Sequence, residues 1–596
     1  MVLATDSLQP DHGQPGGRFW LAWVRWVAMA VLAVAVPYCW CSALMMWIGF
    51  GPRPIVLPLC IGVLVGVVLL VSLAVWPGRR ESRTAWSVPR MGAWALAWSL
   101  AGAAVWYVLS PPFSRDLSIA VGFAAATWWL LWAWLMFVVG WGWPSRLGLL
   151  AVFVAVAALF LSGVTAKGWD GAGRPEIVWR FRATGGTAAA AETAPMCPPD
   201  DKPRSDEIAE YPRFRGADGL ATVSGVNLAR NWSQQKPVLL WRHQVGPAWS
   251  GIVVAGSRAI TQEQRGEDEC VVCYDRHTGG ELWVHRDPAH YRNSGAGDGP
   301  RATPAIDARL VFALGATGIL NCLDRDTGRR HWTVNILTDN EAQAPGHGTV
   351  GSPLVVGDLV VVCAGGPKNA SLVAYGKMTG KRVWGAGGDP AGYTSPLLVE
   401  RSGATQILIV STQTLSAHHP QTGAILWSFP WRNDQATNCS QPFPVGAKGV
   451  FISADYGTGC ALIEVTQEEP GKWDVKPLWS NRAMQTKFCS VVIHEGHAYS
   501  FDDEILECVS VADGRRRWKH GRYGHGQLLL ADDLLLIQAE DGRVVLIEAT
   551  PKEHRELAAF QAIEGKTWNN PALAGRQLFV RNDHEAACYE LPLESK

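Results

Sequence analysis

Hydrophobic positions follow two different patterns along the 596 residues of this chain. The first part contains five long apolar segments, at residues 26–47, 55–76, 91–109, 117–140 and 147–164. Each has about the 20 residues that an α-helix needs to cross about 30 Å of hydrocarbon. We therefore expect residues 1–165 to form a transmembrane domain of five helices.

Charged residues in this part predict how the helices are oriented. The connection at residues 77–90 carries four arginines, and such a cluster normally stays in the cytoplasm. Counting helices from it puts the N-terminus in the cytoplasm and everything after residue 164 in the periplasm, as expected for a multi-pass protein of a bacterial inner membrane. The five segments themselves contain no Asp, Glu, Lys, Arg or His, which argues against a proton or ion pathway.

The fourth apolar segment is rich in tryptophan. Interfacial packing of these rings and a flat pocket for a quinone or a lipid headgroup are both open, and general enrichment of Trp at membrane boundaries favours packing. From residue 166 to residue 209 the chain is rich in Gly, Ala, Thr, Pro and charge, as in "GGTAAAAETAPMCPPDDKPRSDE". This composition is typical of a linker.

After the linker, the pattern changes to short apolar runs that each end in a polar turn and a tryptophan. The copies are "CVVCYDRHTGGELW", "ILNCLDRDTGRRHW", "SLVAYGKMTGKRVW", "TLSAHHPQTGAILW" and "ILECVSVADGRRRW", with degenerate copies ending at Trp479 and near Phe560. Successive tryptophans lie 39 to 52 residues apart, which fits the four short strands of a β-propeller blade. In each copy we expect a strand, a turn whose Gly takes positive φ, and a second strand whose Trp packs on the next blade.

Eight positions mark the start of an innermost strand. They are Gly251, Thr303, Ser352, Ser395, Gln441, Ser490, Gly526 and Asn570. Residues 210–596 are therefore predicted to form an all-β, eight-bladed propeller with four-stranded antiparallel blades. The last blade has too few strands of its own, whereas "VLLWRHQV" at residues 238–245 is one strand without a sheet, so we expect the two to pair and close the ring.

Composition supports this architecture and excludes one class of partner. Thirty tryptophans and 62 glycines suit many strands, tight turns and large packing rings. The 53 basic and 53 acidic side chains balance, so no excess of positive charge predicts binding to nucleic acid.

The repeat, idealised as A-x-D-x-x-T-G-x-x-x-W, resembles that of the pyrroloquinoline quinone (PQQ) propeller superfamily over residues 211–591. Segments such as "YPRFRGADG", "GPRATPAI" and "EGKTWNNPAL" look like a bacterial branch named only for the repeat. The superfamily includes PQQ-dependent alcohol and sugar dehydrogenases, and also a scaffold lipoprotein of outer-membrane protein assembly that binds no quinone. The layout of five helices before a propeller is similar to that of membrane-bound glucose dehydrogenase. The resemblance thus implies the fold and leaves the chemistry open.

Candidate site residues are those that precede the innermost strands, because these line the mouth of the channel in a propeller of this type. They are Trp249, Arg301, His347, Tyr393, Asn438, Lys487, His525, Trp568 and Asn569. This aromatic and cationic set suits an anionic or planar ligand. A PQQ enzyme would also need calcium with oxygen ligands and a carboxylate base, but Asp298 and Asp389 lie near two strand starts without being on one.

Two functions follow from this set. We expect a non-catalytic binding or scaffold module, anchored in the membrane, that takes a protein or a small-molecule ligand at its mouth, with no catalytic residue, cofactor or metal assigned. The alternative is a quinoprotein dehydrogenase that oxidises a sugar or an alcohol with PQQ and calcium and passes electrons to membrane quinone. A short propeller favours the first function, and the five-helix layout favours the second.

The cysteines are predicted to be packing residues. Cys273, Cys322, Cys508 and Cys588 occupy the repeat position that holds alanine in other copies, where a small apolar side chain is required. Cys270 and Cys273 lie three apart on one strand, so their side chains should point to opposite faces and cannot share a metal. A disulfide between Cys439 and Cys489 stays open in an oxidising compartment.

Overall fold

Most of the described chain folds into short antiparallel strands. The computed structural model describes residues 164–169, 175–179, 209–293 and 295–594. The five predicted membrane spans lie outside these residues, except for Val164. Among the described helices, none is long and apolar enough to cross a membrane. Two strands, β1 (Val164–Trp169) and β2 (Pro175–Trp179), pair in a sheet of their own within the predicted linker and its border.

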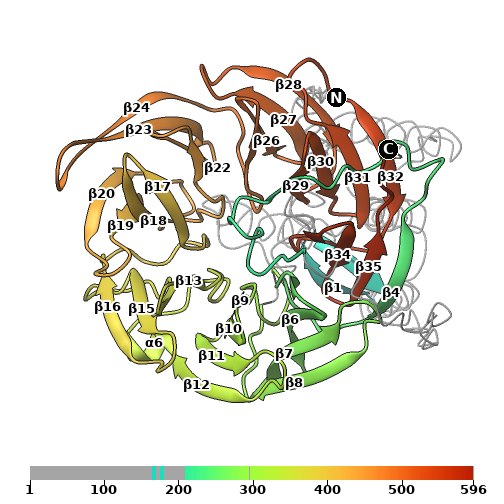
Figure 1. Cartoon of the computed structure of the whole chain (residues 1–596), viewed down its shortest axis with the longest axis horizontal. Coiled ribbons are helices and arrows are strands. Elements are labelled where there is room, and N and C mark those ends of the chain that lie inside the picture. The colour runs from blue at the N-terminus through green and yellow to red at the C-terminus, as the bar shows by residue number, and fades with distance from the viewer. Residues whose placement is uncertain (1–163, 170–174, 180–208, 294, 595–596) are drawn as a thin grey trace, which may run out of the picture. The chain divides into compact units, whose positions relative to one another are not determined.

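Within residues 209–594, eight sheets surround a common axis as the blades of a propeller (Figure 1). Blade 1 has the strands Val253–Ala255 (β5), Arg258–Arg265 (β6), Asp268–Asp275 (β7) and Glu281–Asp287 (β8). Blade 2 has Ala305–Asp307 (β9), Leu310–Leu314 (β10), Ile319–Asp324 (β11) and Arg330–Asn335 (β12), followed by the short helix Ile336–Asp339 (α6). Blade 3 has Leu354–Val356 (β13), Leu359–Val362 (β14), Leu372–Gly376 (β15) and Arg382–Ala386 (β16). Blade 4 has Leu397–Arg401 (β17), Ala404–Val410 (β18), Thr414–His418 (β19) and Ile425–Pro430 (β20).

The second half of the ring repeats this order. Blade 5 has Phe443–Val445 (β21), Gly449–Ala454 (β22), Gly459–Glu469 (β23) and Lys472–Asn481 (β24). Blade 6 has Val492–His494 (β25), His497–Asp502 (β26), Ile505–Ser510 (β27) and Arg516–Arg522 (β28). Blade 7 has Gln527–Ala531 (β29), Leu534–Gln538 (β30), Arg543–Glu548 (β31) and Glu556–Gln561 (β32). Blade 8 has Ala572–Ala574 (β33), Gln577–Arg581 (β34), Glu585–Glu590 (β35) and, from the N-terminal side, Val238–Gln244 (β4).

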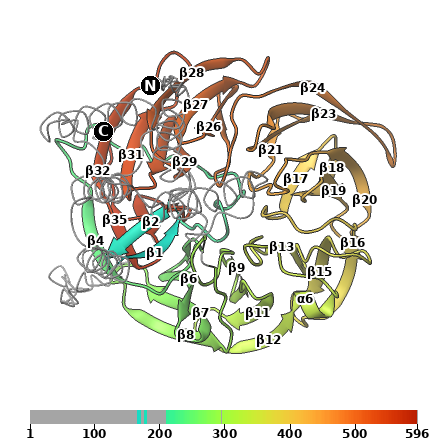
Figure 2. The ribbon, with the colours of Figure 1, turned by 180° about the vertical axis from the view of Figure 1, so that it is seen from behind.

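Ring closure occurs as predicted. Strand β4 pairs antiparallel with β35, so the chain's own N-terminal strand completes blade 8 and leaves it with the same four strands as its neighbours. The innermost strands, including β9, β13 and β21, gather near the axis (Figure 2). The eight-bladed prediction is confirmed. One blade differs from it, because a two-residue strand, Thr222–Val223 (β3), adds to β29 in parallel and gives blade 7 a fifth strand.

The repeated tryptophan joins neighbouring blades. Trp332 Nε1–H, on the outer strand of blade 2, donates to the carbonyl of Lys377 in the turn of blade 3 at 2.9 Å. The equivalent bonds run from Trp241, Trp283, Trp384, Trp479 and Trp518 to the next blade. Trp427 instead bonds Gln406 within its own blade, because blade 5 has the long hairpin β23–β24 in place of a Thr-Gly turn.

Cysteine packs directly across from this tryptophan. Cys322 pairs with Trp332, and Cys588 pairs with Trp241 in the same register. Burial raises the pKa of the Cys322 thiol to about 12, so it is no nucleophile at neutral pH. All nine described cysteines are free thiols, Cys439 and Cys489 included, and the packing prediction is confirmed.

The turn of the repeat requires glycine for two reasons: its φ is positive, and a tryptophan ring of the neighbouring blade lies against it. Gly328 has φ +70°, and a Cβ there would lie 2.5 Å from Cε3 of Trp283. Gly266 is a matched control, since it has φ +60° and nothing within 4 Å of its would-be Cβ.

We expect Gly328→Ala to lower the free energy of unfolding by about 2–4 kcal/mol, because a left-handed φ and an overpacked ring add up. Gly266→Ala should lower the free energy of unfolding by about 1–2 kcal/mol, because only the positive φ is unfavourable there. Urea unfolding of both variants, followed by circular dichroism, measures the difference. Equal losses would show that the tryptophan contact does not restrict this turn.

The innermost strands begin two residues or one residue after the predicted starts, and the side chains at those starts connect the blades. The N–H of each of the first five starts, from Gly251 to Gln441, donates to the side chain of the next start around the ring, at 2.9–3.3 Å. We call the five accepting residues the polar belt: Thr303, Ser352, Ser395, Gln441 and Ser490.

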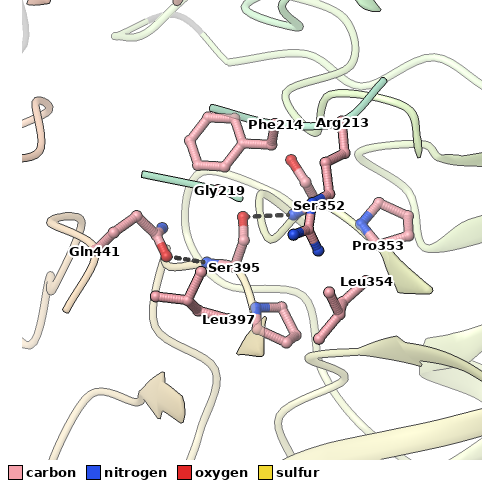
Figure 3. Close-up of a pocket in the computed structure, with 10 residues that line it drawn as sticks. Arg213, Phe214, Gly219, Ser352, Pro353, Leu354, Ser395, Leu397 and Gln441 are labelled. Carbon is pink, nitrogen blue, oxygen red and sulfur yellow. Dashed lines mark hydrogen bonds between the residues drawn. The ribbon is translucent and has the colours of Figure 1, made fainter. Parts of the chain in front are cut away.

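Residues 211–223 cross the channel inside the ring, and Figure 3 shows part of this segment beside the polar belt. Tyr211 bridges to Val254 on β5, and Ile306 N–H on β9 donates to the Pro212 carbonyl at 2.7 Å. The Arg215 side chain, only 2% exposed, donates to the carbonyl of Val491 beside β25 at 2.7 Å. The segment then continues into β3 on blade 7. It therefore ties four blades together from inside the ring.

Candidate functional site at the channel mouth

All nine predicted site residues lie in the connections that lead into the innermost strands, from Trp249 before β5 to Asn569 before β33. Because every blade has the same strand order, these connections share one end of the channel. We call this end the mouth. The residues of the mouth fall into two groups with different contacts.

Four rings form a continuous surface along one side of the mouth, here called the aromatic arc: Trp249, Trp568, Phe488 and His525. The ring centroids are 4.9 Å apart for Trp249 and Trp568, 5.0 Å for Trp568 and Phe488, and 5.5 Å for Phe488 and His525. These separations are typical of packed aromatic pairs. Trp249, Phe488 and Trp568 keep part of their surface accessible.

Two lysines accompany the aromatic arc. Lys566 Nζ lies 4.6 Å from the ring centroid of Trp568 and 5.5 Å from that of Trp249. Lys487 Nζ lies 5.6 Å from the ring centroid of Phe488. Ammonium groups at these distances interact favourably with the ring faces. The arc therefore offers flat apolar surface together with positive charge.

The carboxylate of Glu540 holds two residues of the aromatic arc in position. Glu540, in the connection between β30 and β31, accepts from Trp568 Nε1–H at 2.8 Å and from the His525 N–H at 2.9 Å. Both oxygens are thereby engaged in positioning mouth residues, which is a structural role.

His525 carries a buried ring nitrogen, Nε2, that has no hydrogen-bond partner among the described residues. Its side chain is 2% exposed. Burial lowers the pKa of His525, with Glu540 opposing this shift and Lys487 adding to it. The imidazole is therefore neutral at pH 7.

Arg301, on the other side of the mouth, is committed to the backbone. Its guanidinium donates to the carbonyls of His347, Gly299 and Gly297, and stacks on Tyr291 with Cζ 4.7 Å from the ring centroid. Burial lowers the pKa of Arg301 to about 10. This arginine holds two connections together, and few of its N–H groups remain to bind a ligand.

The remaining predicted residues also support the loops. His347 is exposed and lies 5.6 Å from the Tyr393 ring, whose pKa burial raises to about 12. Asn438 donates to the carbonyls of Ser411 and Trp431. Asn569 donates to the carbonyls of Ala248 and Ser250. Sequence position thus found the mouth, but only part of it is free to bind.

A calcium ion with PQQ would need several oxygen ligands around one point. Among the described residues, no three carboxylate, histidine or cysteine side chains gather in that way. Asp298 accepts from the Asn293 N–H and contacts His290, whereas Asp389 accepts from Ser411 and Thr414. Both aspartates therefore shape loops and do not point to a ligand cluster at the mouth.

Four residues of the mouth were missed from the sequence: Tyr291, Phe488, Glu540 and Lys566. Phe488 follows Lys487 directly and Lys566 lies two positions before Trp568, so choosing one or two residues in each connection passed over both. Tyr291 lies ten positions before Arg301 in the same connection, and Glu540 lies in the β30–β31 connection, which the repeat does not mark. A search of the whole connection for aromatic residues would have found Phe488 and Tyr291.

Comparisons with known proteins agree with the fold. The family model described as outer membrane protein assembly factor BamB, a PQQ-repeat family, matches residues 220–386 and 267–520, together half of the chain. A curated relative, quinoprotein ethanol dehydrogenase of Pseudomonas putida, is 28% identical over 148 residues, which are 22% of this chain and 23% of the relative. The chain thus spans about a quarter of the length of that relative.

Solved structures of similar proteins include BamB from Moraxella catarrhalis, with 15% identity, a TM-score of 0.44, and coverage of 60% of this chain and 99% of that one. Quinohemoprotein alcohol dehydrogenase from Comamonas testosteroni has 11% identity, a TM-score of 0.46, and coverage of 65% and 81%. With a family model over half its length and eight four-stranded blades, most of them joined by the repeated tryptophan, this chain belongs to the PQQ-repeat β-propeller family.

Proposed function

We propose that this protein is a membrane-anchored periplasmic β-propeller that binds a partner at its mouth without catalysis. The observation that carries this proposal is the aromatic arc, with Lys487 and Lys566 against its rings. Tryptophan and phenylalanine surfaces of this kind contribute most of the binding energy in protein interfaces. Two buried polar residues of the mouth, Arg301 and Asn569, are engaged by backbone carbonyls.

The arc indicates a partner of complementary chemistry. Flat apolar surface favours aromatic side chains, and the positive charge of Lys487 and Lys566 beside the rings favours acidic ones. A polypeptide segment with aromatic and acidic residues supplies both. We therefore take a protein segment as the partner in this proposal.

Photo-crosslinking in cells tests the binding surface. With p-benzoylphenylalanine in place of Trp568 in the full-length chain, we expect a discrete covalent adduct. The same substitution at Leu282, whose residue is 44% exposed on the outer strand β8, is the control and should give none. Lys487→Glu with Lys566→Glu should abolish the adduct at position 568. The same crosslinked bands from positions 568 and 282 would contradict binding at the mouth.

A quinoprotein dehydrogenase is the second candidate, favoured by the match of 148 residues to quinoprotein ethanol dehydrogenase. Purified full-length protein in detergent, supplied with PQQ and calcium chloride, should not reduce an artificial electron acceptor when given alcohols or sugars. Sustained turnover that requires both PQQ and substrate would replace the first proposal with this one.

Membrane anchoring is supported by the five apolar segments and by the arginines at residues 77–90. Alkaline phosphatase, which is active only in the periplasm, should be active when fused after residue 210 and inactive when fused after residue 85. A fluorescent protein that folds only in the cytoplasm should give the opposite pattern. Phosphatase activity at both positions would contradict the proposed orientation.

A further inference from the structure

Tyr456 is the only aromatic residue with a positive φ among the described residues. Its φ is +58°, in the turn between β22 and β23, and Gly457 follows with φ +80°. This left-handed backbone is unfavourable for a bulky side chain, because its Cβ comes too close to the following carbonyl oxygen. Glycine has no Cβ and adopts the same φ readily. The turn thus carries a tyrosine where glycine would suit the backbone better.

This turn lies at the mouth. In each blade the innermost strand starts at the mouth and the second strand runs antiparallel back to it, so the β22–β23 turn lies at the same end as Glu540 of blade 7. The Gly457 N–H donates to Gln485 Oε1 at 2.9 Å. Gln485 belongs to the connection into blade 6, which also carries Phe488. The Tyr456 turn is therefore fixed beside the aromatic arc.

Lys487 connects Tyr456 to the aromatic arc. Its Nζ lies 5.8 Å from the ring centroid of Tyr456 and 5.6 Å from that of Phe488. One ammonium group thus interacts favourably with two rings, one from blade 5 and one from the connection into blade 6. The result is an unbroken series of contacts from the entry of blade 1 to blade 5: Trp249, Trp568, Phe488, Lys487 and Tyr456.

Tyr456 is half-buried, as are the arc residues Trp249, Phe488 and Trp568, so part of its surface is accessible. Burial raises the pKa of the Tyr456 hydroxyl, which therefore stays protonated at neutral pH. The side chain is uncharged and offers a flat ring to an apolar or aromatic group. Strained backbone of this kind is concentrated at binding and active sites, where the side chain is needed despite the strain.

We propose that Tyr456 is a contact residue for the partner, so that the binding surface extends from the aromatic arc to blade 5. This inference rests on the proposed function and specifies which part of the mouth the partner covers. The ring of Tyr456 packs against an apolar or aromatic side chain of the bound segment. The positive charge of Lys487, between the two rings, favours acidic side chains in the same segment.

Photo-crosslinking in cells tests the contact directly. With p-benzoylphenylalanine in place of Tyr456 in the full-length chain, we expect an adduct with the same protein, identified by mass spectrometry, as from position 568. Glu495 is the matched control and should give no adduct. It has the same kind of turn, with φ +45° followed by Gly496 at φ +73°, but between β25 and β26, at the end of the innermost strand away from the mouth.

The crosslinking result also separates this inference from the proposed function. An adduct from position 568 with none from position 456 would overturn the inference and leave binding at the aromatic arc intact. No adduct from either position would overturn both.

Tyr456→Gly separates binding from stability. Glycine relieves the unfavourable backbone, so the midpoint of urea unfolding should be no lower than in wild type. The yield of the adduct from position 568 should nevertheless fall about tenfold, as expected for an aromatic contact residue in an interface. Tyr456→Phe keeps the ring and should keep the yield.

Glu495→Gly makes the same backbone change away from the mouth and should also leave the yield unchanged. A wild-type yield in Tyr456→Gly would overturn the inference. A lower midpoint of unfolding in that variant would overturn it as well, because the tyrosine would then be required by the fold.

Discussion

Trp241→Ala is expected to lower the free energy of unfolding by about 3–5 kcal/mol, the range for removing a buried aromatic side chain. Trp241 is 5% exposed on β4, the strand that closes the ring. Its Nε1–H donates to the Arg276 carbonyl of blade 1 at 2.9 Å, and its ring lies against Gly279 and stacks on His243 at 5.0 Å. One substitution therefore weakens both the pairing within blade 8 and its contact with blade 1.

Urea unfolding of the full-length protein, followed by far-ultraviolet circular dichroism, measures this loss. Val238→Ala, at a 55% exposed position of the same strand, should change the free energy of unfolding by less than about 0.5 kcal/mol. Because an opened ring also releases the segment before β4, trypsin should cut after Arg230 faster in Trp241→Ala. Stability and cleavage like those of Val238→Ala would mean that ring closure does not depend on this tryptophan.

The closing strand was predictable because the relevant pattern is local. "VLLW" has the apolar run and the tryptophan of the repeat, and the last blade lacked a strand, so counting alone pairs the two. The eight strand starts were predictable for the same reason. Each combines a small or polar residue with an apolar run at the period of the blades.

Contacts between distant parts of the chain were not predictable in this way. Thr303, Ser352 and Ser395 serve as markers of strand starts in the sequence, but the N–H groups that their hydroxyls accept belong to other blades. The channel-crossing segment has no periodicity of its own. Its parallel pairing through β3 depends on the position of blade 7, some 300 residues later.

The candidate site also has features that the sequence pattern predicts and features that depend on contacts between distant residues. Position before a strand start correctly placed Trp249, His525 and Trp568 at the mouth, because strand order alone decides that. Which of the residues remain able to bind depends on side-chain partners. Arg301 is a plausible ligand residue by its charge, but three backbone carbonyls already occupy its guanidinium.

Arg581→Met is expected to cost about 3–5 kcal/mol of the free energy of unfolding, because it breaks a buried charge network. Arg581 is 1% exposed on β34. Its guanidinium donates to Thr261 Oγ1 at 2.7 Å and to the carbonyls of Gln262 and Gly246 at 2.8 and 3.0 Å, so it joins blade 8 to blade 1. Methionine fills similar space but leaves these acceptors buried without donors.

The same substitution should change how stability depends on pH, through Glu263. Burial raises the pKa of this carboxyl, but Arg581, the Tyr274 hydroxyl and the Gly246 N–H together outweigh burial and hold the pKa below its usual value. A group with a depressed pKa in the folded state stabilises above its unfolded pKa, and this stabilisation is lost as pH falls through the folded pKa. Without Arg581, the pKa of Glu263 in the folded state rises.

Acid-induced loss of stability should therefore begin at higher pH in Arg581→Met than in wild type. Urea unfolding at a series of pH values from 7 to 4 measures the two profiles. Arg515→Met, whose side chain is 81% exposed, is the matched control and should follow the wild-type profile. If Arg581→Met lost the same free energy at every pH, its role would be hydrogen bonding to the backbone alone. A profile displaced only in Arg581→Met would show that its charge keeps Glu263 ionised where blades 8 and 1 meet.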